Sequence, residues 1–209
     1  MLEAQNLWFR YGKRNPWVLR AAALKVRPGE IVGLQGESGQ GKSTLARVLA
    51  GYLCAQRGAV LLDDSPLPTK GFLPVQLVFQ SPELAVNPRW PIRLILTEGG
   101  VPIDEALEMS GLDREVLNRY PHELSGGELQ RVCLARVLCA KTRYLVADEI
   151  SAMLDPLSQA RLWRRLQSYA ARSGIGILAI SHDVELLRCI CDQILEMKQI
   201  NRQEKNHGT

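Results

Sequence analysis

Four short runs of hydrophobic residues stand out along the chain, each without polar alternation. They are Ile31–Leu34, Leu77–Phe79, Tyr144–Ala147 and Ile177–Ile180. Apolar runs of this length, with β-branched residues among them, are typical of strands that are buried on both faces of a sheet. The pattern therefore predicts a mainly parallel sheet at the centre of the protein.

Longer segments with helical spacing of apolar residues lie between and after these runs. The segments that we expect to be helical are Lys42–Gly51, Ser125–Ala140, Pro156–Arg172 and Asp183–Cys191. Strands that alternate with helices favour an α/β fold. Ligands of such sheets bind beyond the carboxyl ends of the strands, so the residues that follow the four runs are candidates for a functional site.

Two parts of the chain depart from this alternation. Leu2–Tyr11 and Trp17–Val26 have the pattern of antiparallel strands, whereas Ser81–Leu124 contains several prolines and only weak helical spacing, from Ile103 to Leu117. We expect a single domain, 1–209, with its core at 1–80 and 136–200. An inserted helical subdomain is expected at about 81–135, and a polar tail at 201–209.

Composition limits the class of protein. The 209 residues are 46% hydrophobic and 23% charged, as expected for one globular domain and not for a disordered chain. The formal charge of +4 is spread along the chain, so we expect no nucleic-acid partner. The five cysteines lack the paired spacing of zinc and redox motifs. No apolar stretch approaches the roughly 18 residues that cross a bilayer, so other chains would have to supply any spanning helices.

The segment from Gly36 to Thr44 has the P-loop pattern, in which a glycine and four further residues precede glycine, lysine and serine. It lies where the first buried run passes into a predicted helix. A simple glycine-rich turn would explain the glycines but not the Lys42–Ser43 pair. Lys42, expected in an exposed loop, can bridge the β- and γ-phosphates of a nucleotide, and the Ser43 hydroxyl can bind Mg²⁺. The predicted nucleotide-binding residues here are Gly36, Ser38, Gly39, Gly41, Lys42, Ser43 and Thr44.

Two acidic residues, Asp148 and Glu149, end the third buried run. An unpaired carboxylate at such a position is costly, and a nearby cation would remove the cost. We expect Asp148 to hold Mg²⁺ through water and Glu149 to activate the water that attacks the γ-phosphate. The alternative, an acid pair that only caps the next turn, is weakened by the P-loop in the same chain.

A second glycine-rich helix start lies at Leu124–Arg131, which reads Leu-Ser-Gly-Gly-Glu-Leu-Gln-Arg. Ser125 can cap the helix, while Gly126 and Gly127 permit close approach to an anion. This run resembles the signature motif of ABC ATPases, and the resemblance extends from Leu2 to about Lys198. It implies a P-loop NTPase with an ABC-type ATPase core, an N-terminal antiparallel β subdomain and an inserted helical subdomain, which binds and hydrolyses ATP with Mg²⁺.

The resemblance also implies roles for single residues. Tyr11 is similar to the aromatic residue that stacks on adenine, with Phe9 and Trp8 open as alternatives. Gln80 resembles the glutamine that contacts Mg²⁺ or the attacking water and couples the site to the membrane partner. His182 resembles the switch histidine that contacts the γ-phosphate.

In this family two ATPase domains face each other head to tail, and each ATP lies between one P-loop and the signature motif of the partner. Ser125, Gly126 and Gly127 would then serve the opposite site. ATP would close the dimer and hydrolysis would open it. The implied partners are a second ATPase subunit, identical or not, and transmembrane permease subunits. The implied location is the inner face of the bacterial cell membrane.

One segment differs from the family pattern. Ile150–Asp155 reads Ile-Ser-Ala-Met-Leu-Asp, where the family usually has Pro-Thr-Ser-Ala-Leu-Asp. The missing proline leaves the conformation of this loop open.

A hint of subfamily comes from Gln80 with the Asn87-Pro88-Arg89 run that follows it. This arrangement resembles ATPases of bacterial importers for peptides and nickel. We therefore expect an importer subunit. Relatives in soluble assemblies, such as the carbon-phosphorus lyase complex, provide the alternative.

Overall fold

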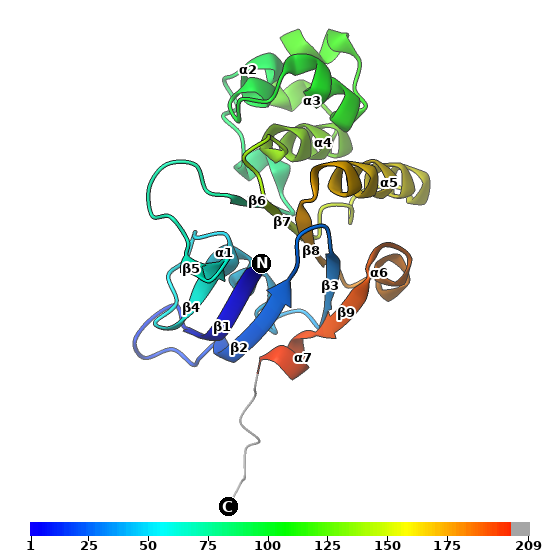
Figure 1. Ribbon diagram of the computed structural model, residues 1–209. Helices are drawn as coiled ribbons and strands as arrows, with labels where there is room; N and C mark the ends of the chain where they lie inside the picture. The colour runs from blue at the N-terminus through cyan, green and yellow to red at the C-terminus, as the bar shows by residue number, and fades with distance from the viewer. Residues whose placement is uncertain (202–209) are drawn as a thin grey trace, which may run out of the picture.

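The computed structural model describes residues 1–201 and contains two sheets with helices on either side of the larger one (Figure 1). The larger sheet is parallel, in the order β6-β7-β8-β3-β9. Its strands are β3 (Ile31–Gln35), β6 (Val75–Val78), β7 (Tyr144–Asp148), β8 (Gly176–Ile180) and β9 (Gln193–Glu196). The predicted parallel sheet is confirmed: three of the hydrophobic runs lie within β3, β7 and β8, and Leu77–Phe79 overlaps the end of β6. The edge strand β9 was missed because it is short and has a polar residue at each end.

The smaller sheet is antiparallel, in the order β2-β1-β4-β5. It contains β1 (Leu2–Phe9), β2 (Leu19–Val26), β4 (Arg57–Leu62) and β5 (Ser65–Pro66). The pairing of β1 with β2 agrees with the sequence. β4 was not predicted, and Gly58 within it explains why its pattern is weak. Gly58 has φ +84° and lies so close to β1 that a Cβ atom would meet the carbonyl oxygens of Gln5 and Asn6 at 2.3 Å.

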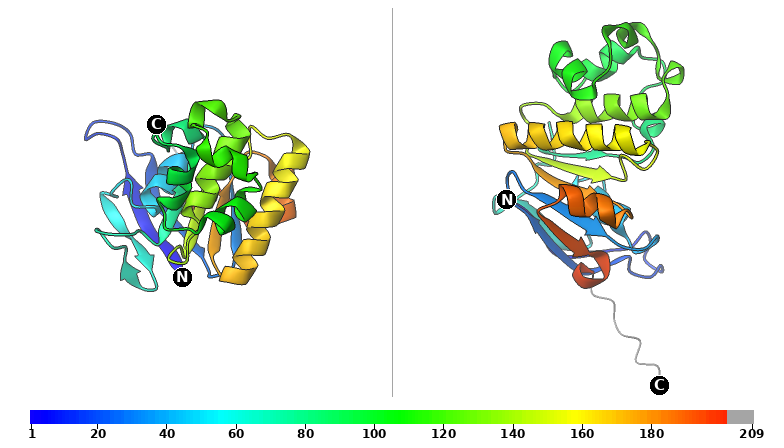
Figure 2. Two further views of the ribbon diagram at one scale, coloured as in Figure 1. Left: turned by 90° about the horizontal axis from the view of Figure 1, so that it is seen from above. Right: turned by 90° about the vertical axis from the view of Figure 1, so that its right-hand side faces the viewer.

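Helix α1 (Lys42–Leu49) packs between the two sheets, in a core shared by β1, β2 and one face of the parallel sheet. The opposite face is covered by α4 (Gly126–Val137), α5 (Pro156–Ser173) and α6 (Val184–Ile190). Figure 2 shows this arrangement in layers from two further directions. The parallel sheet is therefore buried on both faces, as its continuous hydrophobic runs require.

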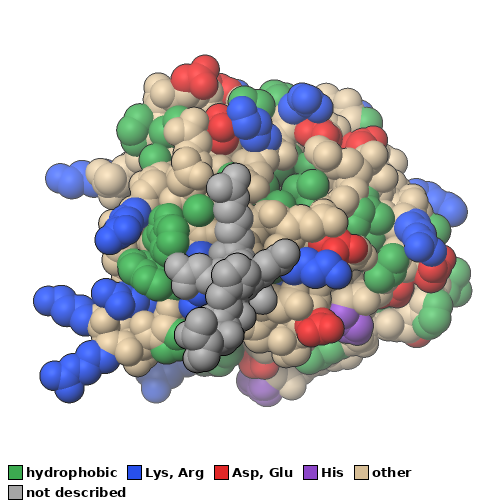
Figure 3. Space-filling model, turned by 90° about the horizontal axis from the view of Figure 1, so that it is seen from below, with side chains coloured by type: hydrophobic (Ala, Val, Ile, Leu, Met, Phe, Trp, Pro, Cys, Tyr) green, Lys and Arg blue, Asp and Glu red, His purple; other side chains and the backbone are tan. Residues whose placement is uncertain are grey.

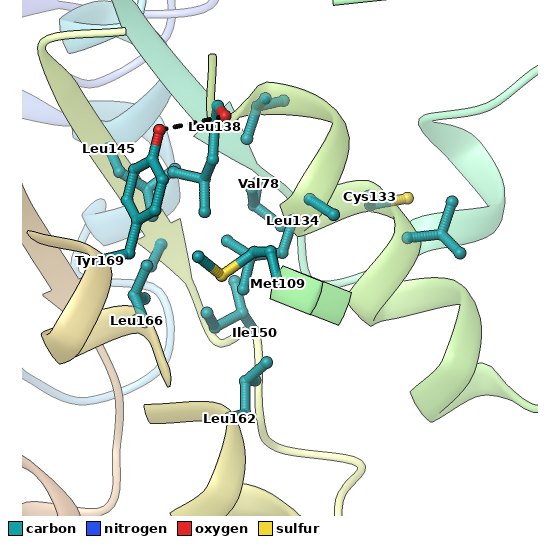
Figure 4. Packing of buried hydrophobic residues seen from close by; sticks show 14 of the residues in the cluster. Val78, Met109, Cys133, Leu134, Leu138, Leu145, Ile150, Leu162, Leu166 and Tyr169 are labelled. Atoms are coloured by element: carbon teal, nitrogen blue, oxygen red, sulfur yellow. Dashed lines mark hydrogen bonds between the residues drawn. The ribbon is translucent and has the colours of Figure 1, made fainter. Parts of the chain in front are cut away.

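The helical subdomain consists of α2 (Ile92–Thr97), α3 (Ile103–Ser110) and α4, with 3₁₀ turns at Pro82–Leu84, Arg114–Asn118 and Pro121–Glu123. The weak helical spacing predicted to Leu117 ends early, because Gly111 adopts φ +61° and caps α3. Figure 4 shows how Met109 of α3 packs with side chains of α4 and α5, and how the Tyr169 hydroxyl donates a 3.1 Å hydrogen bond to the Leu138 carbonyl. Apolar contacts thus join the subdomain to the core.

The chain returns to the antiparallel sheet through α7 (Met197–Ile200), a single turn that follows β9. Asn201, the first residue of the predicted tail, is buried and hydrogen bonded. The rest of that tail, 202–209, lies outside the described residues. Within the described part of the chain, no helix is both long and apolar enough to cross a membrane.

Candidate functional site

A cavity of about 530 Å³ lies beyond the carboxyl ends of the parallel strands. The P-loop forms one wall, and residues that follow β6, β7 and β8 form the other. Its lining residues are Tyr11, Val18, Ser38, Gly39, Gly41, Lys42, Ser43, Thr44, Gln80, Asp148, Glu149 and His182. Most residues that were predicted to bind nucleotide or to take part in catalysis therefore line one cavity, although they are separated by up to 171 positions in the sequence.

The P-loop presents the open start of α1 to this cavity. Gly41 precedes the helix with φ +97°, and a Cβ atom there would lie 3.0 Å from Val18 Cγ1 and 3.2 Å from its carbonyl oxygen. The first turn of α1 contains no acidic residue and its N-terminus has no side-chain cap. Its free N–H groups and helix dipole can therefore attract a phosphate.

Lys42 does not lie in an exposed loop, so that prediction is wrong. The side chain is only 9% exposed, and its Nζ donates hydrogen bonds to the carbonyl oxygens of Gly36 at 2.6 Å and Glu37 at 2.9 Å. The burial of Lys42 was not predicted because it arises only when the P-loop folds back over the first residue of α1. An ammonium group held inside the loop is positioned before any phosphate arrives.

Gly36 does not line this cavity, although its carbonyl holds Lys42. It faces a neighbouring hollow of about 370 Å³, together with Gln40 and Met197. Gly36 thus lies beside the cavity and holds the lysine, and its contact with a nucleotide stays a prediction.

Asp148 is buried, and one of its two carboxylate oxygens lacks a hydrogen-bond partner. The residue is 6% exposed, and its Oδ1 atom has no partner. Burial raises the pKa of its carboxyl group; a hydrogen bond from Ser43 opposes this effect, and nearby Glu149 adds to it. A cation would satisfy the orphaned oxygen. The residues fit Mg²⁺ in particular, because this ion commonly takes only one or two carboxylates and completes its shell with phosphate and water.

We expect Asp148→Asn to make the nucleotide-free protein more stable at neutral pH. A carboxyl group whose pKa is higher in the folded than in the unfolded state destabilises the fold when ionised, and this cost disappears as the pH falls through the raised pKa. A higher Tm is therefore expected at neutral pH, and the gain should shrink at low pH, where the parent carboxyl group is also protonated. Thermal unfolding without Mg²⁺ measures it. The exposed Asp113, changed to Asn, is the control, and an equal Tm in both variants at neutral pH would contradict the prediction.

Glu149 and His182 form a second polar group in the cavity. A hydrogen bond of 2.7 Å joins Glu149 Oε2 to His182 Nδ1. The Glu149 side chain is 13% exposed, whereas that of His182 is 71% exposed. Glu149 has φ +54°, an uncommon value for this residue type, and its N–H donates to the Ile180 carbonyl at 3.0 Å. Strained backbone of this kind clusters at functional sites, which supports a functional role for Glu149.

The position of Tyr11 distinguishes it from the other two aromatic candidates. Its half-exposed ring lines the cavity, and its hydroxyl lies 3.0 Å from Thr44 Oγ1. Phe9 is buried behind it, with the two ring centroids 5.0 Å apart. Trp8 instead packs edge-on against Trp17. The geometry favours Tyr11 as the residue that meets a nucleotide base.

Basic residues on this side of the protein have local partners. The Arg10 guanidinium lies 4.4 Å from the centroid of the Trp17 ring, and that of Arg57 lies 5.9 Å from the rings of both Trp8 and Trp17. In Figure 3, Lys and Arg side chains occur along the left edge, the side on which the antiparallel sheet lies, next to a group of hydrophobic side chains. Cation–π contacts with these indole rings therefore hold Arg10 and Arg57 without a bound ligand.

Ser125, Gly126 and Gly127 are not among the residues that line the cavity. Ser125 begins α4 through a capping box, in which its N–H donates to Glu128 Oε2 at 2.8 Å and its hydroxyl accepts from the Glu128 N–H at 3.3 Å. A Cβ atom on Gly126 would meet nothing within 4 Å. This helix start is therefore open, and lies apart from the phosphate site of its own chain.

The loop at Ile150–Asp155 keeps a defined conformation without the usual proline. Ile150 is buried, and Ser151 Oγ accepts hydrogen bonds from Gln159 Nε2 at 3.0 Å and from Trp163 Nε1 at 3.1 Å. Asp155 caps α5 by accepting from two backbone N–H groups. Gln159 and Trp163 were missed because their contribution depends on the packing of α5 against the loop.

A parallel sheet with a P-loop after β3 and an acid pair at the end of β7 defines a P-loop nucleoside triphosphatase. The model of the family described as "ABC transporter" matches residues 19–152. The chain therefore belongs to the ATP-binding proteins of ABC transporters, an ATPase family.

Curated relatives agree with this family. The nickel import ATP-binding protein NikE of Escherichia coli K12 is 37% identical over 199 residues, which cover 86% of this chain and 74% of NikE. A putative peptide import ATP-binding protein of Brucella abortus is 35% identical over 200 residues, which cover 85% of this chain and 60% of that protein. YejF of E. coli K12, an uncharacterised ABC transporter ATP-binding protein, is 33% identical, and the match covers only 38% of its length.

A solved structure has the same fold. It is the dimeric ATP-binding cassette MJ0796 bound to ADP and phosphate, with a TM-score of 0.81 at 22% identity, and the match covers 94% of both chains. The predicted ABC-type core is thereby confirmed at the level of the fold.

Proposed function

We propose that this chain binds ATP with Mg²⁺ in the 530 Å³ cavity and hydrolyses the bond between the β- and γ-phosphates. The observation that carries the proposal is the meeting of the P-loop lysine, the orphaned carboxylate of Asp148 and the Glu149–His182 pair in that cavity. Tyr11 would stack on the base and the start of α1 would bind phosphate. Ser38, Gly39, Gly41 and Thr44 would complete the contacts.

Ser43 and Asp148 would hold the metal ion, with Gln80 beside them. Mg²⁺, when bound, offsets negative charge on the β- and γ-phosphates. Glu149 would accept a proton from the attacking water, and His182 would hold the Glu149 carboxylate and contact the γ-phosphate. A bond forms between the water oxygen and the γ-phosphorus as the bridging bond to the β-phosphate breaks, which yields ADP and phosphate.

We further propose that the site is completed by a second ATPase subunit. The supporting observation is that Ser125, Gly126 and Gly127 begin α4 outside the cavity of their own chain, with open space at Gly126. Such a start can bind the γ-phosphate of a nucleotide held by a partner, so two chains would enclose two nucleotides. Closure with ATP and opening after hydrolysis would then give two states.

The transported solute is proposed from the relatives and from the Asn87-Pro88-Arg89 run. Relatives named for nickel import and for peptide import support an importer subunit that works with transmembrane permease subunits. We propose uptake of a peptide or a nickel chelate, with this chain at the inner face of the cell membrane. Because no described helix can cross a membrane, the spanning helices would belong to the permease.

An uptake experiment tests the proposed import. The chromosomal gene is changed to encode Lys42→Ala, and uptake of radioactive nickel and of a labelled short peptide is measured. Loss of either uptake, with Lys70→Ala as a surface control, would support import. Normal uptake of both solutes together with loss of growth on a phosphonate would instead favour a soluble complex of the carbon-phosphorus lyase kind.

A further inference from the structure

The last described residue, Asn201, is held beside the P-loop by hydrogen bonds. Asn201 is 5% exposed, and its N–H donates to the Met197 carbonyl at 2.9 Å, which closes the single turn of α7. Its side-chain Oδ1 accepts a 2.7 Å hydrogen bond from the Arg20 N–H, and its Nδ2 donates to the Val18 carbonyl at 2.9 Å. Asn201 therefore bonds the backbone on both sides of Leu19, more than 180 positions away in sequence.

These contacts reach the P-loop in two ways. Asn201 Nδ2 also lies 3.4 Å from the carbonyl oxygen of Gln40, within hydrogen-bonding distance. In addition, the Val18 carbonyl that Asn201 holds is the group that lies against Gly41, where a Cβ atom would be 3.2 Å away. Gln40 and Gly41 directly precede Lys42, so a shift of this backbone would move the lysine and the start of α1.

The same turn supports the other end of the P-loop. Met197 is fully buried, and its Cβ atom lies 2.9 Å from the position that a Cβ atom on Gly36 would occupy. Gly36 is also the residue whose carbonyl accepts the 2.6 Å hydrogen bond from Lys42 Nζ. Met197 and Asn201 thus touch the first and the fifth residue of the loop, Gly36 and Gln40.

We propose that Asn201 is a positioning residue of the phosphate site, through which α7 fixes the shape of the P-loop. This inference rests on the proposed nucleotide-binding function and adds a residue from outside the recognised motifs. Two of its hydrogen bonds reach the loop: one holds the Val18 carbonyl that lies against Gly41, and the other goes to the Gln40 carbonyl. The side chain needs both a donor and an acceptor, which only an amide supplies at this length.

The test compares Asn201→Asp and Asn201→Leu with Ile200→Ala in the otherwise unchanged chain. Aspartate keeps the acceptor for the Arg20 N–H but turns an oxygen toward the carbonyls of Val18 and Gln40, and leucine removes all three contacts at similar volume. Ile200 is the adjacent residue and packs against the same core, but it lines a different hollow from the P-loop. It controls for a general loss of stability.

Three quantities are measured: Tm, amide hydrogen exchange of the segment 36–44 without nucleotide, and the Kd for ATP. We expect several-fold faster exchange of this segment in both Asn201 variants, and ATP binding weakened roughly fivefold to tenfold, as loss of a typical hydrogen bond gives. Ile200→Ala is expected to lower Tm while leaving exchange at 36–44 and ATP binding unchanged.

Parent-like exchange in the Asn201 variants would overturn the inference, and so would equal effects of Ile200→Ala on the loop at an equal loss of Tm. If the parent chain does not bind ATP, the proposed function fails. The exchange comparison still decides the role of Asn201 in that case, because it is made without nucleotide.

Discussion

Lys42→Ala should lower the rate of ATP hydrolysis roughly 10²–10³-fold, the loss that follows removal of one preorganised group that stabilises developing charge. The lysine ammonium is fixed between the carbonyl oxygens of Gly36 and Glu37, so little reorganisation is needed when phosphate enters. Binding of ATP should weaken as well, by roughly 10–100-fold, because a charge-assisted hydrogen bond is lost. A phosphate-release assay and equilibrium binding measure the two effects.

The variant should stay folded at a cost on the order of 1 kcal/mol, because two backbone carbonyls lose their partner. Circular dichroism checks this. Lys70→Ala, which removes an exposed lysine outside the cavity, is the matched control and should hydrolyse ATP as the parent does. Parent-like hydrolysis by Lys42→Ala would rule out the P-loop as the phosphate site.

Glu149→Gln should slow hydrolysis roughly 10²–10⁴-fold, the usual contribution of a general base, and leave the Kd for ATP nearly unchanged. The amide has the shape of the carboxylate and can still hydrogen bond to His182 Nδ1, but it cannot accept a proton from water. Single-turnover hydrolysis with saturating ATP and Mg²⁺ measures the chemical step. The effect therefore separates binding from catalysis, which Lys42→Ala does not.

Glu185→Gln provides the control for this variant. Glu185 is an exposed acid in the first turn of α6, shortly after His182, and forms an ion pair with Arg188 away from the cavity lining. Its loss should not change the rate. If Glu149→Gln hydrolyses ATP at the rate of Glu185→Gln, another group serves as the base.

The parts of the protein that the sequence predicted are those in which structure is encoded locally. The P-loop from Gly36 to Thr44 is contiguous, and the buried runs before it and before Asp148 require little more than their own hydrophobicity. Because parallel strands expose their carboxyl ends on one edge, the predicted topology also implied that Gln80, Asp148 and His182 would meet. Their catalytic roles remain predictions.

What the sequence did not predict depends on contacts between distant segments. No local pattern encodes the burial of Lys42 or the hydrogen bond from Trp163 to Ser151. The same holds for the hydrogen bond from Asn201 to the Val18 carbonyl. Asn201 in particular was assigned to a polar tail, since a single asparagine after an apolar turn resembles an exposed end. Its burial could have been found only from the position of β2 beside the P-loop.

ATP-dependent association tests most directly whether the ATP site is shared between two subunits. Light scattering is measured on Glu149→Gln, alone and mixed with a cognate second ATPase, with and without ATP and Mg²⁺. Gly126→Arg in the same background serves as the comparison, because the added side chain has free space in the monomer and leaves the Ser125 cap in place. We predict a dimer only with ATP, no dimer with Gly126→Arg, and equal ATP binding by both monomers. Two results would contradict a shared site. One is a Glu149→Gln protein that stays monomeric with saturating ATP both alone and mixed with the second ATPase. The other is a Gly126→Arg variant that dimerises as its parent does.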